Sequence, residues 1–581
     1  MAVYNDAHMF PLHDPLDEAA RAALAPYDDL TAALLVRRGM KTEEDAETFF
    51  NPSYDSHVHD PLLMTDMRKA ARRLAQAVLS GERIAVWSDY DCDGIPGGVL
   101  MHDFLKKTAA DFENYIPHRH NEGYGMNIDG IEKLSRNGVR LVVTVDSGIT
   151  DTEPIKRANE LGMDAIVTDH HLPGTVLPDA FAIVNPNARP DEPYPFRSLC
   201  GAAVAWKLVC ATLSEEPAIR ARIPTGWEKW LLDMVGLATI ADVVPLTGEN
   251  RVLAAYGMRV LRKSRRIGLQ KLCREMRLAQ QTLTEDDVGF MLAPRVNAAS
   301  RMGDARAALD LFTTDNEDEA GELAKKLERA NRQRKAEAGA ITRTIHGRLK
   351  ERGELRSVIA LGDPEWRPAL LGLVANTIAE EYGRPVFLWG REGNLRIKGS
   401  VRSGNVHALE LMRATDNTFS EFGGHAAAGG FTVHDDAVFF FEDRLVEAYA
   451  RIMPTASPAA SLVPPADAEI KTESVGLPLL EMVEKFAPFG RENPKPVFLL
   501  RAGVVHEISR FGKKEEHLKV TLVSEAGKLV EAIMFFAKGN ILHRTETLER
   551  GARLNMLAHL ERNPFSRKTP VRLRLLDLRL V

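Results

Sequence analysis

The sequence predicts a multidomain α/β protein with a doubly wound parallel sheet in its first half and a small β-structure at its end. Between about residues 61 and 310, short apolar strands alternate with helical segments, which is typical of a doubly wound parallel sheet. Residues 517–523 and 571–576 alternate apolar and polar side chains with a period of two, which indicates a half-exposed β-structure. Because 581 residues exceed what one hydrophobic core organises, we expect roughly three or four domains.

Short helices are expected in residues 1–60, which we interpret as a docking segment. One helix should begin at Thr42, because Thr42 and Asp45 have the spacing of a capping box. The alternating region then predicts strands at residues 84–87, 115–116, 141–145 and 165–168. Helices are predicted after Gly98, around Ile131 and at residues 151–161.

Residues 316–352 are predicted to form one long, largely exposed helix between two lobes. This segment is charged and free of proline, and its apolar residues, such as Leu323, Leu327 and Ile341, recur at near-helical spacing. The next lobe should contain strands at residues 357–361 and 385–389, with a helix at 371–380 between them. Residues 453–465 are rich in proline and are expected to form a linker.

These boundaries divide the chain into six parts. They are an N-terminal helical docking segment (1–60), a larger α/β domain (61–315), a connecting helix (316–352), a smaller α/β domain (353–452), a linker (453–465) and a C-terminal β-domain (466–581).

Composition excludes a protein that attracts nucleic acid through its overall charge. The chain has 75 Lys and Arg against 81 Asp and Glu, a formal net charge of −6, so any such binding must use local patches. The basic run at residues 259–277 is one candidate, although a solvated helix face would have the same composition.

Cysteine usage and hydropathy favour the cytoplasm. The four cysteines form no Cys-x-x-Cys pair and are too few and too scattered for a disulfide framework (Cys92, Cys200, Cys210 and Cys273). No apolar run reaches the roughly 18 residues that a membrane span requires, and the N-terminus lacks a basic leader followed by an apolar core. We therefore expect a cytoplasmic protein that does not enter a membrane.

Three carboxylates at alternate positions follow the first predicted strand and precede Gly94. Asp89, Asp91 and Asp93 share the opening of an EF-hand calcium loop, but the twelfth position, which needs a bidentate Glu, is Leu100. An acidic turn without a cation is the simpler alternative. The segment becomes more informative together with the strands that follow it.

Further polar side chains follow three later apolar runs. Asp146 follows residues 141–145, and Asp169, His170 and His171 follow residues 165–168. Asp242 follows another apolar run. The carboxyl ends of parallel strands lie together, so these side chains are expected to converge on one crevice. Taken singly, an Asp such as Asp242 is more often a helix cap than a ligand, and isolated histidines such as His170 and His171 more often bond backbone carbonyls.

Carboxylates with one or two imidazoles suit Mn²⁺ or Mg²⁺ better than thiolate-binding metals. One ion cannot use so many carboxylates. A pair of divalent cations about 3.5–4 Å apart, bridged by one Asp, is able to activate water and hold phosphate oxygens. The sequence therefore predicts a two-metal centre.

In this order, the motifs resemble those of the DHH phosphoesterase superfamily and, within it, the RecJ family of bacterial single-strand-specific exonucleases. Further segments in family order support the resemblance: residues 59–62, 115–119, 123–125, 294–303, 399–403, 423–430 and 489–498. It covers nearly the whole chain. It implies that residues 61–315 are a DHH catalytic domain, 353–452 a DHHA1 substrate domain, and 466–581 an OB-fold that binds nucleic acid.

The resemblance also implies roles for individual residues. The metal ligands would be Asp91, Asp93, Asp146, His170 and Asp242. His171 would face the scissile phosphate or the leaving oxygen, so that His171 and Asp146 are the catalytic pair. Asp169 is expected to hold an imidazole in its ligating tautomer, whereas Asp89 is either an outer ligand or an anchor for the turn.

Substrate contacts are expected from both α/β domains. The resemblance implies that the substrate is bound by Asn297, Arg301, Arg402, Gly423, Gly424 and His425. Gly423 and Gly424 would let backbone N–H groups approach a phosphate, although a tight loop before a helix at Ala426 also explains the two glycines.

The implied activity is a metal-dependent exonuclease that degrades single-stranded DNA from 5′ to 3′ into mononucleotides in DNA repair and recombination. Its partners would be single-stranded DNA, a helicase and a single-strand-binding protein, and no oligomer is required. One alternative is a DHH phosphodiesterase acting on short oligoribonucleotides or cyclic dinucleotides, which would need neither the long helix nor the C-terminal β-domain. Another is a non-catalytic DHH scaffold, which should have lost metal ligands.

Two features of the sequence do not determine how the substrate is positioned. The last β-domain carries Arg562, Arg567, Lys568, Arg572, Arg574 and Arg579, which either track a single strand or protect edge strands from aggregation. The chain departs from the family pattern at Ile95-Pro96-Gly97-Gly98, where a hydroxyl-bearing pair is usual, at Ser300 and around Arg367. These departures concern substrate positioning and leave the metal ligands intact.

Overall fold

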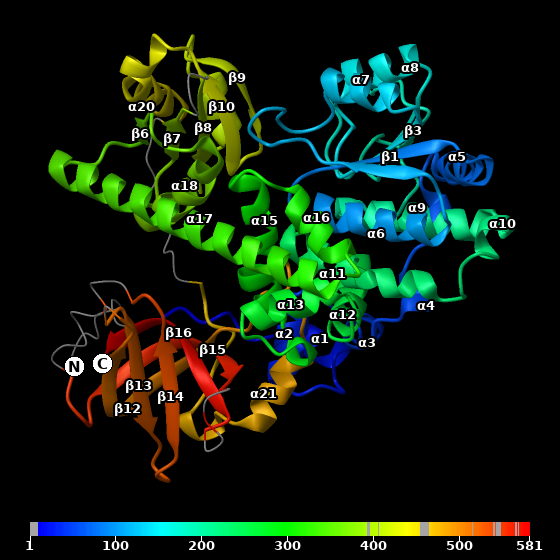
Figure 1. Cartoon of the computed structure of the whole chain (residues 1–581). Helices are drawn as coiled ribbons and strands as arrows, with labels where there is room; N and C mark the ends of the chain where they lie inside the picture. The colour runs from blue at the N-terminus through cyan, green and yellow to red at the C-terminus, as the bar shows by residue number, and fades with distance from the viewer. Residues whose placement is uncertain are drawn as a thin grey trace.

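Two α/β lobes lie side by side above a β-barrel, and one long helix runs beneath both lobes (Figure 1). The computed structural model describes residues 10–391, 396–404, 406–453, 464–513, 515–537, 541, 548–563, 566 and 569–581. Arg567, Lys568 and all but the ends of the expected linker at 453–465 lie outside these residues.

The first lobe is built on a five-stranded parallel sheet. Its strands are β1 (Arg83–Ser88), β2 (Phe112–Tyr115), β3 (Val139–Val145), β4 (Asp164–Thr168) and β5 (Ala182–Val184), in the order β2-β1-β3-β4-β5. Helices α5 (Met67–Ser80), α6 (Gly94–Lys107) and α9 (Gly201–Glu215) share a core with one face, and α7 (Ile128–Arg136) and α8 (Thr152–Glu160) with the other. The doubly wound prediction is confirmed. The strand order reverses between β1 and β3, where such sheets bind ligands.

Helix α6 begins already at Gly94, earlier than the predicted start after Gly98. Proline is tolerated at Pro96 because the first N–H groups of a helix have no intrahelical acceptor. A Cβ atom on Gly97 would lie 2.4 Å from Val145 Cγ1, and one on Gly98 would lie 2.7 Å from the Ser88 hydroxyl. The unusual segment therefore lets α6 pack closely against the ends of β1 and β3.

A helical layer completes the first lobe. Its members are α10 (Pro217–Arg220), η3 (Trp227–Leu231), α11 (Leu232–Ala241), α12 (Gly248–Leu261), α13 (Ile267–Glu275), η4 (Gln280–Thr282), α14 (Glu285–Asp287), the π-helix η5 (Val288–Leu292), α15 (Ala293–Arg301) and α16 (Arg306–Thr313). Helices α11 and α12 cross where Gly236 meets Gly257, because a Cβ on Gly257 would lie 2.4 Å from the Gly236 Cα. This close crossing fixes the position of Asp242, which ends α11.

Helix α17 (Glu317–Arg352) joins the two lobes and belongs to both cores. Its 36 residues extend about 54 Å at 1.5 Å per residue. Ala324 and Leu327 are buried in the core of the first lobe, whereas Ile341, Ile345 and Leu349 are buried in the second. The predicted long helix is present, and its buried stripe makes it part of each lobe.

The second lobe has a mixed sheet in the order β6-β7-β8-β10-β9. Its elements are β6 (Ile359–Asp363), α18 (Pro368–Tyr382), β7 (Val386–Gly390), β8 (Ile397–Arg402), α19 (Ala408–Arg413), β9 (Phe419–Gly424), β10 (Ala428–Val433), η6 (Ala437–Phe440) and α20 (Phe441–Ile452). The suggestion of a helix at Ala426 is wrong, because residues 425–427 form the turn of a hairpin between β9 and β10. The glycines there allow tight strand pairing.

The C-terminal part is a closed five-stranded barrel. Its elements are β11 (Ala468–Glu469), η7 (Thr472–Ser474), α21 (Leu477–Glu484), β12 (Phe498–Phe511), β13 (His517–Val523), β14 (Leu529–Met534), β15 (Arg553–Arg562) and β16 (Val571–Leu580). Strands pair in the order β12-β13-β14-β16-β15, and β15 pairs back onto β12. This Greek-key closure is that of an OB-fold and confirms the predicted β-domain.

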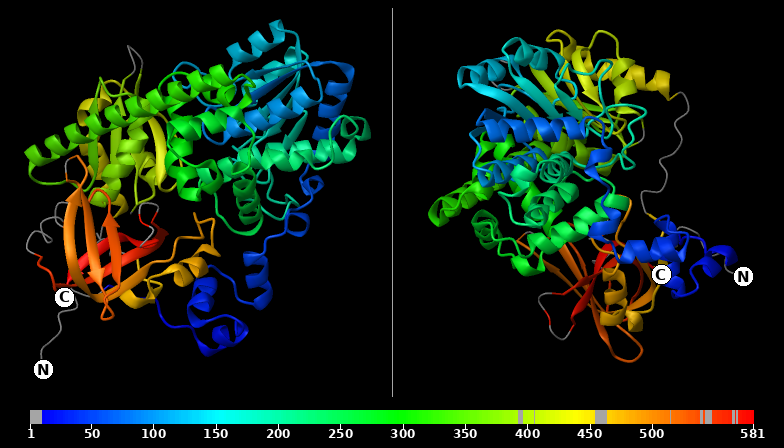
Figure 2. Two further views of the ribbon diagram at one scale, coloured as in Figure 1. Left: turned by 60° about the horizontal axis from the view of Figure 1, so that its bottom comes forward. Right: turned by 90° about the vertical axis from the view of Figure 1, so that its right-hand side faces the viewer.

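The N-terminal helices pack against this barrel (Figure 2). They are α1 (Glu18–Ala23), α2 (Asp29–Arg37) and α3 (Glu43–Phe50), and the capping box of Thr42 and Asp45 is present. The next two elements, α4 (Tyr54–His57) and the short η2 (Pro61–Leu63), pack against the first lobe instead. Leu35 and Phe49 lie in one core with Phe486 and Phe498. The start and the end of the chain therefore form a single packed unit.

Arg251 ties this unit to the first lobe. Its guanidinium is buried, donates to the Phe49 and Phe486 carbonyls at 2.6 and 3.0 Å, and lies 3.4 Å from the centre of the Phe49 ring. Within the described ranges, no helix combines the length and apolarity needed to cross a bilayer.

Candidate metal centre and active site

The predicted polar residues meet at the carboxyl edge of the first sheet. Asp89, Asp91 and Asp93 follow β1, Asp146 follows β3, and the Asp169–His171 segment follows β4. Asp242 is positioned by a helix and not by a strand, because the apolar run before it forms α11. Asp146 adopts a φ of 60°, a strained left-handed conformation of the kind that clusters at functional sites.

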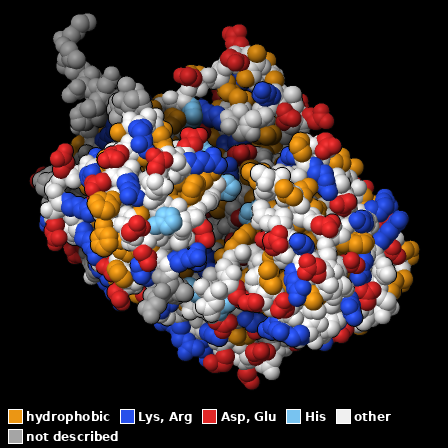
Figure 3. Space-filling model, turned by 90° about the horizontal axis from the view of Figure 1, so that it is seen from above, with side chains coloured by type: hydrophobic (Ala, Val, Ile, Leu, Met, Phe, Trp, Pro, Cys, Tyr) orange, Lys and Arg blue, Asp and Glu red, His pale blue; other side chains and the backbone are white. Residues whose placement is uncertain are grey.

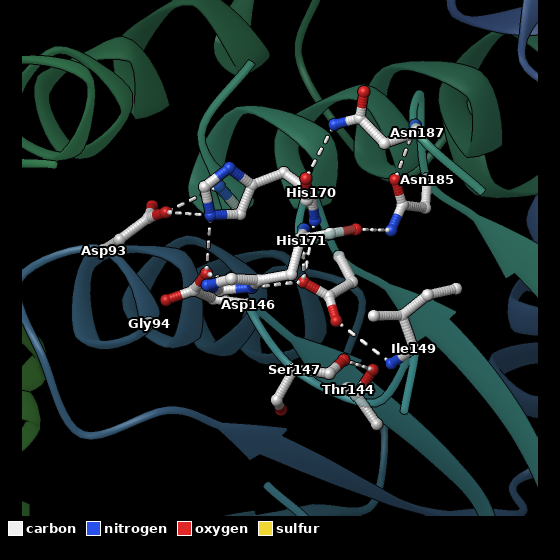
Figure 4. Close-up of polar contacts among 12 residues, drawn as sticks. Asp93, Gly94, Thr144, Asp146, Ser147, Ile149, His170, His171, Asn185 and Asn187 are labelled. Atoms are coloured by element: carbon white, nitrogen blue, oxygen red, sulfur yellow. Dashed lines mark hydrogen bonds and ion pairs between the residues drawn. The ribbon is translucent and has the colours of Figure 1, made fainter. Parts of the chain in front are cut away.

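His170 lies at the centre of one group of carboxylates (Figure 4). Its Nε2 is 3.1 Å from Asp146 Oδ1, 3.6 Å from Asp93 Oδ2 and 3.8 Å from Asp242 Oδ2. One ligand atom each from Asp93, His170 and Asp242 lies within 4.8 Å of the others. These side chains surround one position suitable for a cation.

A second group lies beside the first. Asp89, Asp91 and Asp146 each offer a carboxylate oxygen within 4.8 Å of the others, and Asp146 also groups with His170 and His171. Buried oxygens of Asp89 and Asp146 have no hydrogen-bond partner in the described part of the chain. Asp146 therefore belongs to both groups, and Asp89 lies close enough to join one of them.

The electrostatics of this cluster favour bound cations. Burial, followed by the charges of neighbouring carboxylates, raises the pKa of Asp89 and of Asp146 well above the usual range. The same causes raise the pKa of Asp242 to about 8. Buried carboxylates this close cannot all ionise unless positive charge compensates them. The donor set, which is mostly hard oxygen with imidazole, fits two divalent cations of the Mn²⁺ or Mg²⁺ type.

Two of the acids also accept backbone hydrogen bonds that fix them. Asp93 accepts from the Gly201 and Ala202 N–H groups at 2.6 and 2.8 Å, at the start of α9. Asp91 Oδ1 accepts from the Asp93 N–H at 2.8 Å. These bonds hold the carboxylates in place before any cation arrives.

Asp169 fixes the positions of His170 and His171 through hydrogen bonds. Its Oδ1 accepts from the His170 and His171 N–H groups and lies 2.8 Å from His171 Nδ1, and its Oδ2 accepts from the Ile149 N–H. Burial lowers the pKa of His171, but the Asp169 carboxylate outweighs it and raises that pKa to about 9. Asp169 therefore favours the protonated imidazole and holds its Nδ1 at 2.8 Å.

Tyr124 is a site residue that the prediction missed. Its hydroxyl donates to the Asp146 carbonyl at 3.1 Å and lies 3.1 Å from His171 Nδ1. The sequence did contain an indication of this role, because Tyr124 lies in the family-like segment 123–125. Gly123 and Gly125 flank it, and both adopt positive φ. Tyr124 thus links the strained Asp146 backbone to the imidazole of His171.

A cleft between the two lobes leads to the metal centre. Figure 3 shows the molecule from above, with a groove between the lobes and histidine side chains inside it. A cavity of about 420 Å³ there is lined by Tyr90 and Arg119 from the first lobe, and by Lys398, Phe422 and Gly423 from the second. The cleft is therefore cationic on both sides.

Arginines crowd the first-lobe side of the cleft. The Arg119 guanidinium lies 4.7 Å from the centre of the Tyr90 ring. Arg301 reaches across the cleft and donates to the Ala369 carbonyl of the second lobe at 2.5 Å. Burial and the neighbouring charge of Arg119 lower the pKa of Arg301 to about 9, which marks a site with an excess of positive charge. Such a site fits a phosphate.

The remaining predicted substrate residues lie in different settings. Asn297 accepts from the Cys92 N–H at 2.9 Å and so supports the acidic turn. Arg402 is half-buried beneath α18, where a Cβ on Gly372 would lie 2.9 Å from its Nη2. Gly424 and His425 are exposed at the hairpin and do not line the 420 Å³ cavity. Four further residues that line the cavity were not predicted: Arg119, Arg396, Lys398 and Phe422. Among them, only Arg119 lies in a segment that resembles the family, residues 115–119.

Comparisons with known proteins agree with this architecture. Three family models match: the DHH family N-terminal domain at residues 83–239, the DHHA1 domain at 355–452 and the RecJ OB domain at 466–577. The single-stranded-DNA-specific exonuclease RecJ of Bacillus subtilis (strain 168) is 33% identical over 546 residues, which cover 93% of this chain and 67% of that protein. The corresponding protein of Escherichia coli (strain K12) is 33% identical and covers 81% of this chain and 84% of its own length. The chain belongs to the RecJ family.

Solved structures of RecJ share the whole fold. The crystal structure of RecJ in complex with Mn²⁺ from Thermus thermophilus has a TM-score of 0.79 and 28% identity, covering 99% of this chain and 80% of that one. The structure of RecJ with Mg²⁺ from the same organism has a TM-score of 0.73 and 27% identity, covering 98% of this chain and 78% of that one. The predicted family and fold class are both confirmed.

Proposed function

We propose that this RecJ-family protein is an exonuclease that degrades single-stranded DNA and depends on two divalent cations, Mn²⁺ or Mg²⁺. The observation that carries the proposal is the buried group of carboxylates around His170 at the end of a cationic cleft. The names of its relatives supply the single-stranded substrate. Degradation from 5′ to 3′ into mononucleotides is the finer part of the proposal.

Each residue of the centre has a separate role. Asp91, Asp93, His170 and Asp242, together with Asp89, would hold the cations, and Asp146 would bridge them. When bound, the cations supply an activated water and stabilise charge on the phosphate. Protonated His171 offers its Nε2–H to the phosphate or to the leaving oxygen, and Asp169 fixes that orientation. Tyr124 steadies both His171 and the Asp146 backbone.

The cleft orients the end of the strand. Arg119, Arg301 and Lys398 supply positive charge to terminal phosphates, while the exposed Phe422 offers its ring to a base. Gly423 belongs to β9, the edge strand of its sheet, so part of its backbone is open to a phosphate. These contacts would draw an unpaired strand across the metal centre.

The barrel offers aromatic side chains more clearly than a row of free arginines. Arg562 pairs with Glu484, and Arg572 with Glu561. Arg574 lies 4.2 Å from the centre of the Phe535 ring, and the neighbouring Phe536 is 75% exposed. We therefore include this cluster in the strand path, because exposed rings next to arginine stack with bases of any sequence.

The compartment and partners extend the same proposal. The four cysteines are free thiols, which supports the cytoplasm. A helicase would supply the single strand, and a single-strand-binding protein would meet the enzyme on it, in repair and recombination.

The decisive assay uses single-stranded DNA labelled at either end. We expect the 5′ label to appear in mononucleotides before the strand shortens from its 3′ end, activity to stop in EDTA, and Mn²⁺ to restore it. A 3′ label released first would contradict the polarity. Hydrolysis of short oligoribonucleotides or cyclic dinucleotides without hydrolysis of the DNA strand would favour the alternative phosphodiesterase.

A further inference from the structure

A second and larger cavity lies at the far ends of the helices that carry metal ligands. Its volume is about 930 Å³, near the top of the roughly 300–1,000 Å³ that ligand sites occupy. It is lined by Lys107, Arg222, Trp230, Arg265, Arg266 and Phe312, among others, and is called the far-side groove below.

The far-side groove is separate from the metal centre. Helix α6 begins after Asp93 and ends at Lys107, and its 14 residues extend about 21 Å. Helix α11 starts beside Asp233, which lines the groove, and ends at Asp242, so its 10 residues extend about 15 Å. Each helix thus has one end at the metal centre and the other at the groove.

The carboxylates in the groove are already neutralised. Arg266 pairs with Asp103 at 2.6 Å and with Asp233 at 2.9 Å. Lys106 pairs with Asp315 at 2.6 Å. These pairs are internal to the protein and bring no attraction for a ligand.

Three other cations of the groove enter no ion pair with a described residue, although the Arg222 guanidinium donates to the Thr108 carbonyl at 3.0 Å. Lys107, Arg222 and Arg265 have no carboxylate partner among the residues that the structure describes. In a chain of net charge −6, such a concentration of unpaired positive charge attracts a polyanion locally. The residues of the predicted basic run at 259–277 therefore have different roles. Arg266 forms ion pairs within the protein, whereas the charge of Arg265 remains available to a ligand.

An exposed aromatic ring lies among these cations. Trp230 is 49% exposed, and the Arg265 guanidinium lies 5.8 Å from the centre of its ring. A flat ring beside a cation matches a nucleotide, whose base stacks on the indole while its phosphate meets the arginine or lysine. The combination favours a nucleic acid over an acidic peptide, which needs the charges but not the open indole face.

We propose that the far-side groove is a second, non-catalytic binding site for single-stranded nucleic acid. It would hold a part of the strand distant from the end that lies in the cleft, and so retain a long substrate between cleavage events. The inference rests on the proposed function only for the identity of the strand. Its contacts involve none of the metal ligands.

Binding measurements on the full chain test the charges. In a background of Asp146→Ala, which prevents cleavage, Lys107→Glu with Arg265→Glu should raise the Kd for a long single strand about tenfold, a loss of about 1.4 kcal/mol. The slope of log K against log salt should fall by roughly 1.4, because each lost phosphate contact contributes about 0.7. Fluorescence anisotropy measures both. Lys325→Glu, which reverses an exposed cation on α17 paired with Glu322, is the matched control and should change neither.

The indole is tested separately. Trp230→Ala should weaken long-strand binding, and Trp230→Phe should retain most of it, because the phenyl ring still stacks. A strand carrying 5-iododeoxyuridine should form a photo-crosslink in the peptide that contains Trp230. Unchanged affinity and salt slope in the groove variants, or displacement by polyglutamate with no crosslink to the strand, would overturn the proposal.

Failure of the groove and failure of the nuclease remain distinguishable. With Asp146 intact, the groove variants should cleave a short oligonucleotide that does not extend beyond the cleft at the rate of the unmodified protein. If the unmodified protein cleaves no single strand, the proposed activity is wrong. The anisotropy and crosslinking results would still show whether the far-side groove binds a single strand.

Discussion

Asp146 is the residue on which the metal centre depends most, because it belongs to both groups of potential ligands. Asp146→Ala should lower kcat about a thousandfold or more, since the Lewis-acid contribution of metal ions is worth several kcal/mol. The metal-free variant should unfold at the same or a higher temperature, because the substitution removes a buried carboxylate from a repelling group. Steady-state cleavage and thermal melting check both, and near-normal turnover would refute the bridging role.

Tyr124 offers a subtler test of the same centre. Tyr124→Phe keeps the ring but removes the hydroxyl that contacts Asp146 and His171. We expect kcat to fall about 10–100-fold, the usual cost of losing a group that orients a ligand, with little change in KM. Tyr382→Phe on α18 is the control and should have no effect. A change confined to KM would show that Tyr124 contacts substrate instead.

The carboxylate pKa values predict how pH acts on metal-free protein. Burial and neighbouring acids raise the pKa of Asp242 from 3.8 to about 8, so folding disfavours its ionised form. The metal-free fold should therefore lose stability as pH rises between these values, and bound Mn²⁺ should remove the loss. We expect Mn²⁺ to raise Tm more at pH 8 than at pH 6. Equal shifts at both pH values, measured by calorimetry, would contradict this.

Among the helices, the crossing of α11 and α12 controls the metal centre from a distance. Gly257→Ala places a Cβ about 2.4 Å from the Gly236 backbone, and overpacking of this kind costs about 1–3 kcal/mol. Because α11 ends at Asp242, we also expect weaker Mn²⁺ binding. Gly347→Ala on the exposed side of α17 meets nothing within 4 Å and should be neutral or stabilising. Denaturant unfolding and metal titration compare the two variants.

The elements show what a sequence can and cannot reveal. Strands with periodic apolar runs, such as β3 and β4, were predictable because local pattern decides them. The start of α6 at Gly94 and the hairpin at Ala426 were not, because contacts with distant segments decide them: α6 packs on Val145, and β9 pairs with β10.

The same division holds in the site. Asp91, Asp146 and His170 follow apolar runs in motifs of recognisable order, so their residue types and positions could be predicted. Lys398 and Arg396 could not, because they come to the cleft only when the second lobe packs against the first. Nothing in their local sequence indicates that approach.

Across the whole molecule, Arg251 joins three parts through the backbone carbonyls of Phe49, Phe486 and Ala487. Arg251→Ala would remove the side-chain donor to the buried Phe49 carbonyl, at a cost of about 1–3 kcal/mol, whereas the Phe486 carbonyl would keep its bond from Asn493. The barrel and the N-terminal helices should then unfold earlier than the first lobe. Arg259→Ala, on the same helix but over the Tyr256 ring, should cost much less. Denaturation followed by hydrogen exchange would separate the parts.

The shared core of the first helices and the final barrel also sets an order of events during synthesis. Leu35 and Phe49 find their partners only after residues beyond 466 have been made. At about 5–20 residues per second, the ribosome needs roughly 20–80 s to reach that point. Throughout this interval the apolar faces of α2 and α3 lack their partners from the barrel and remain exposed to water. Helices α2 and α3 are thus synthesised early but are among the last elements to fold.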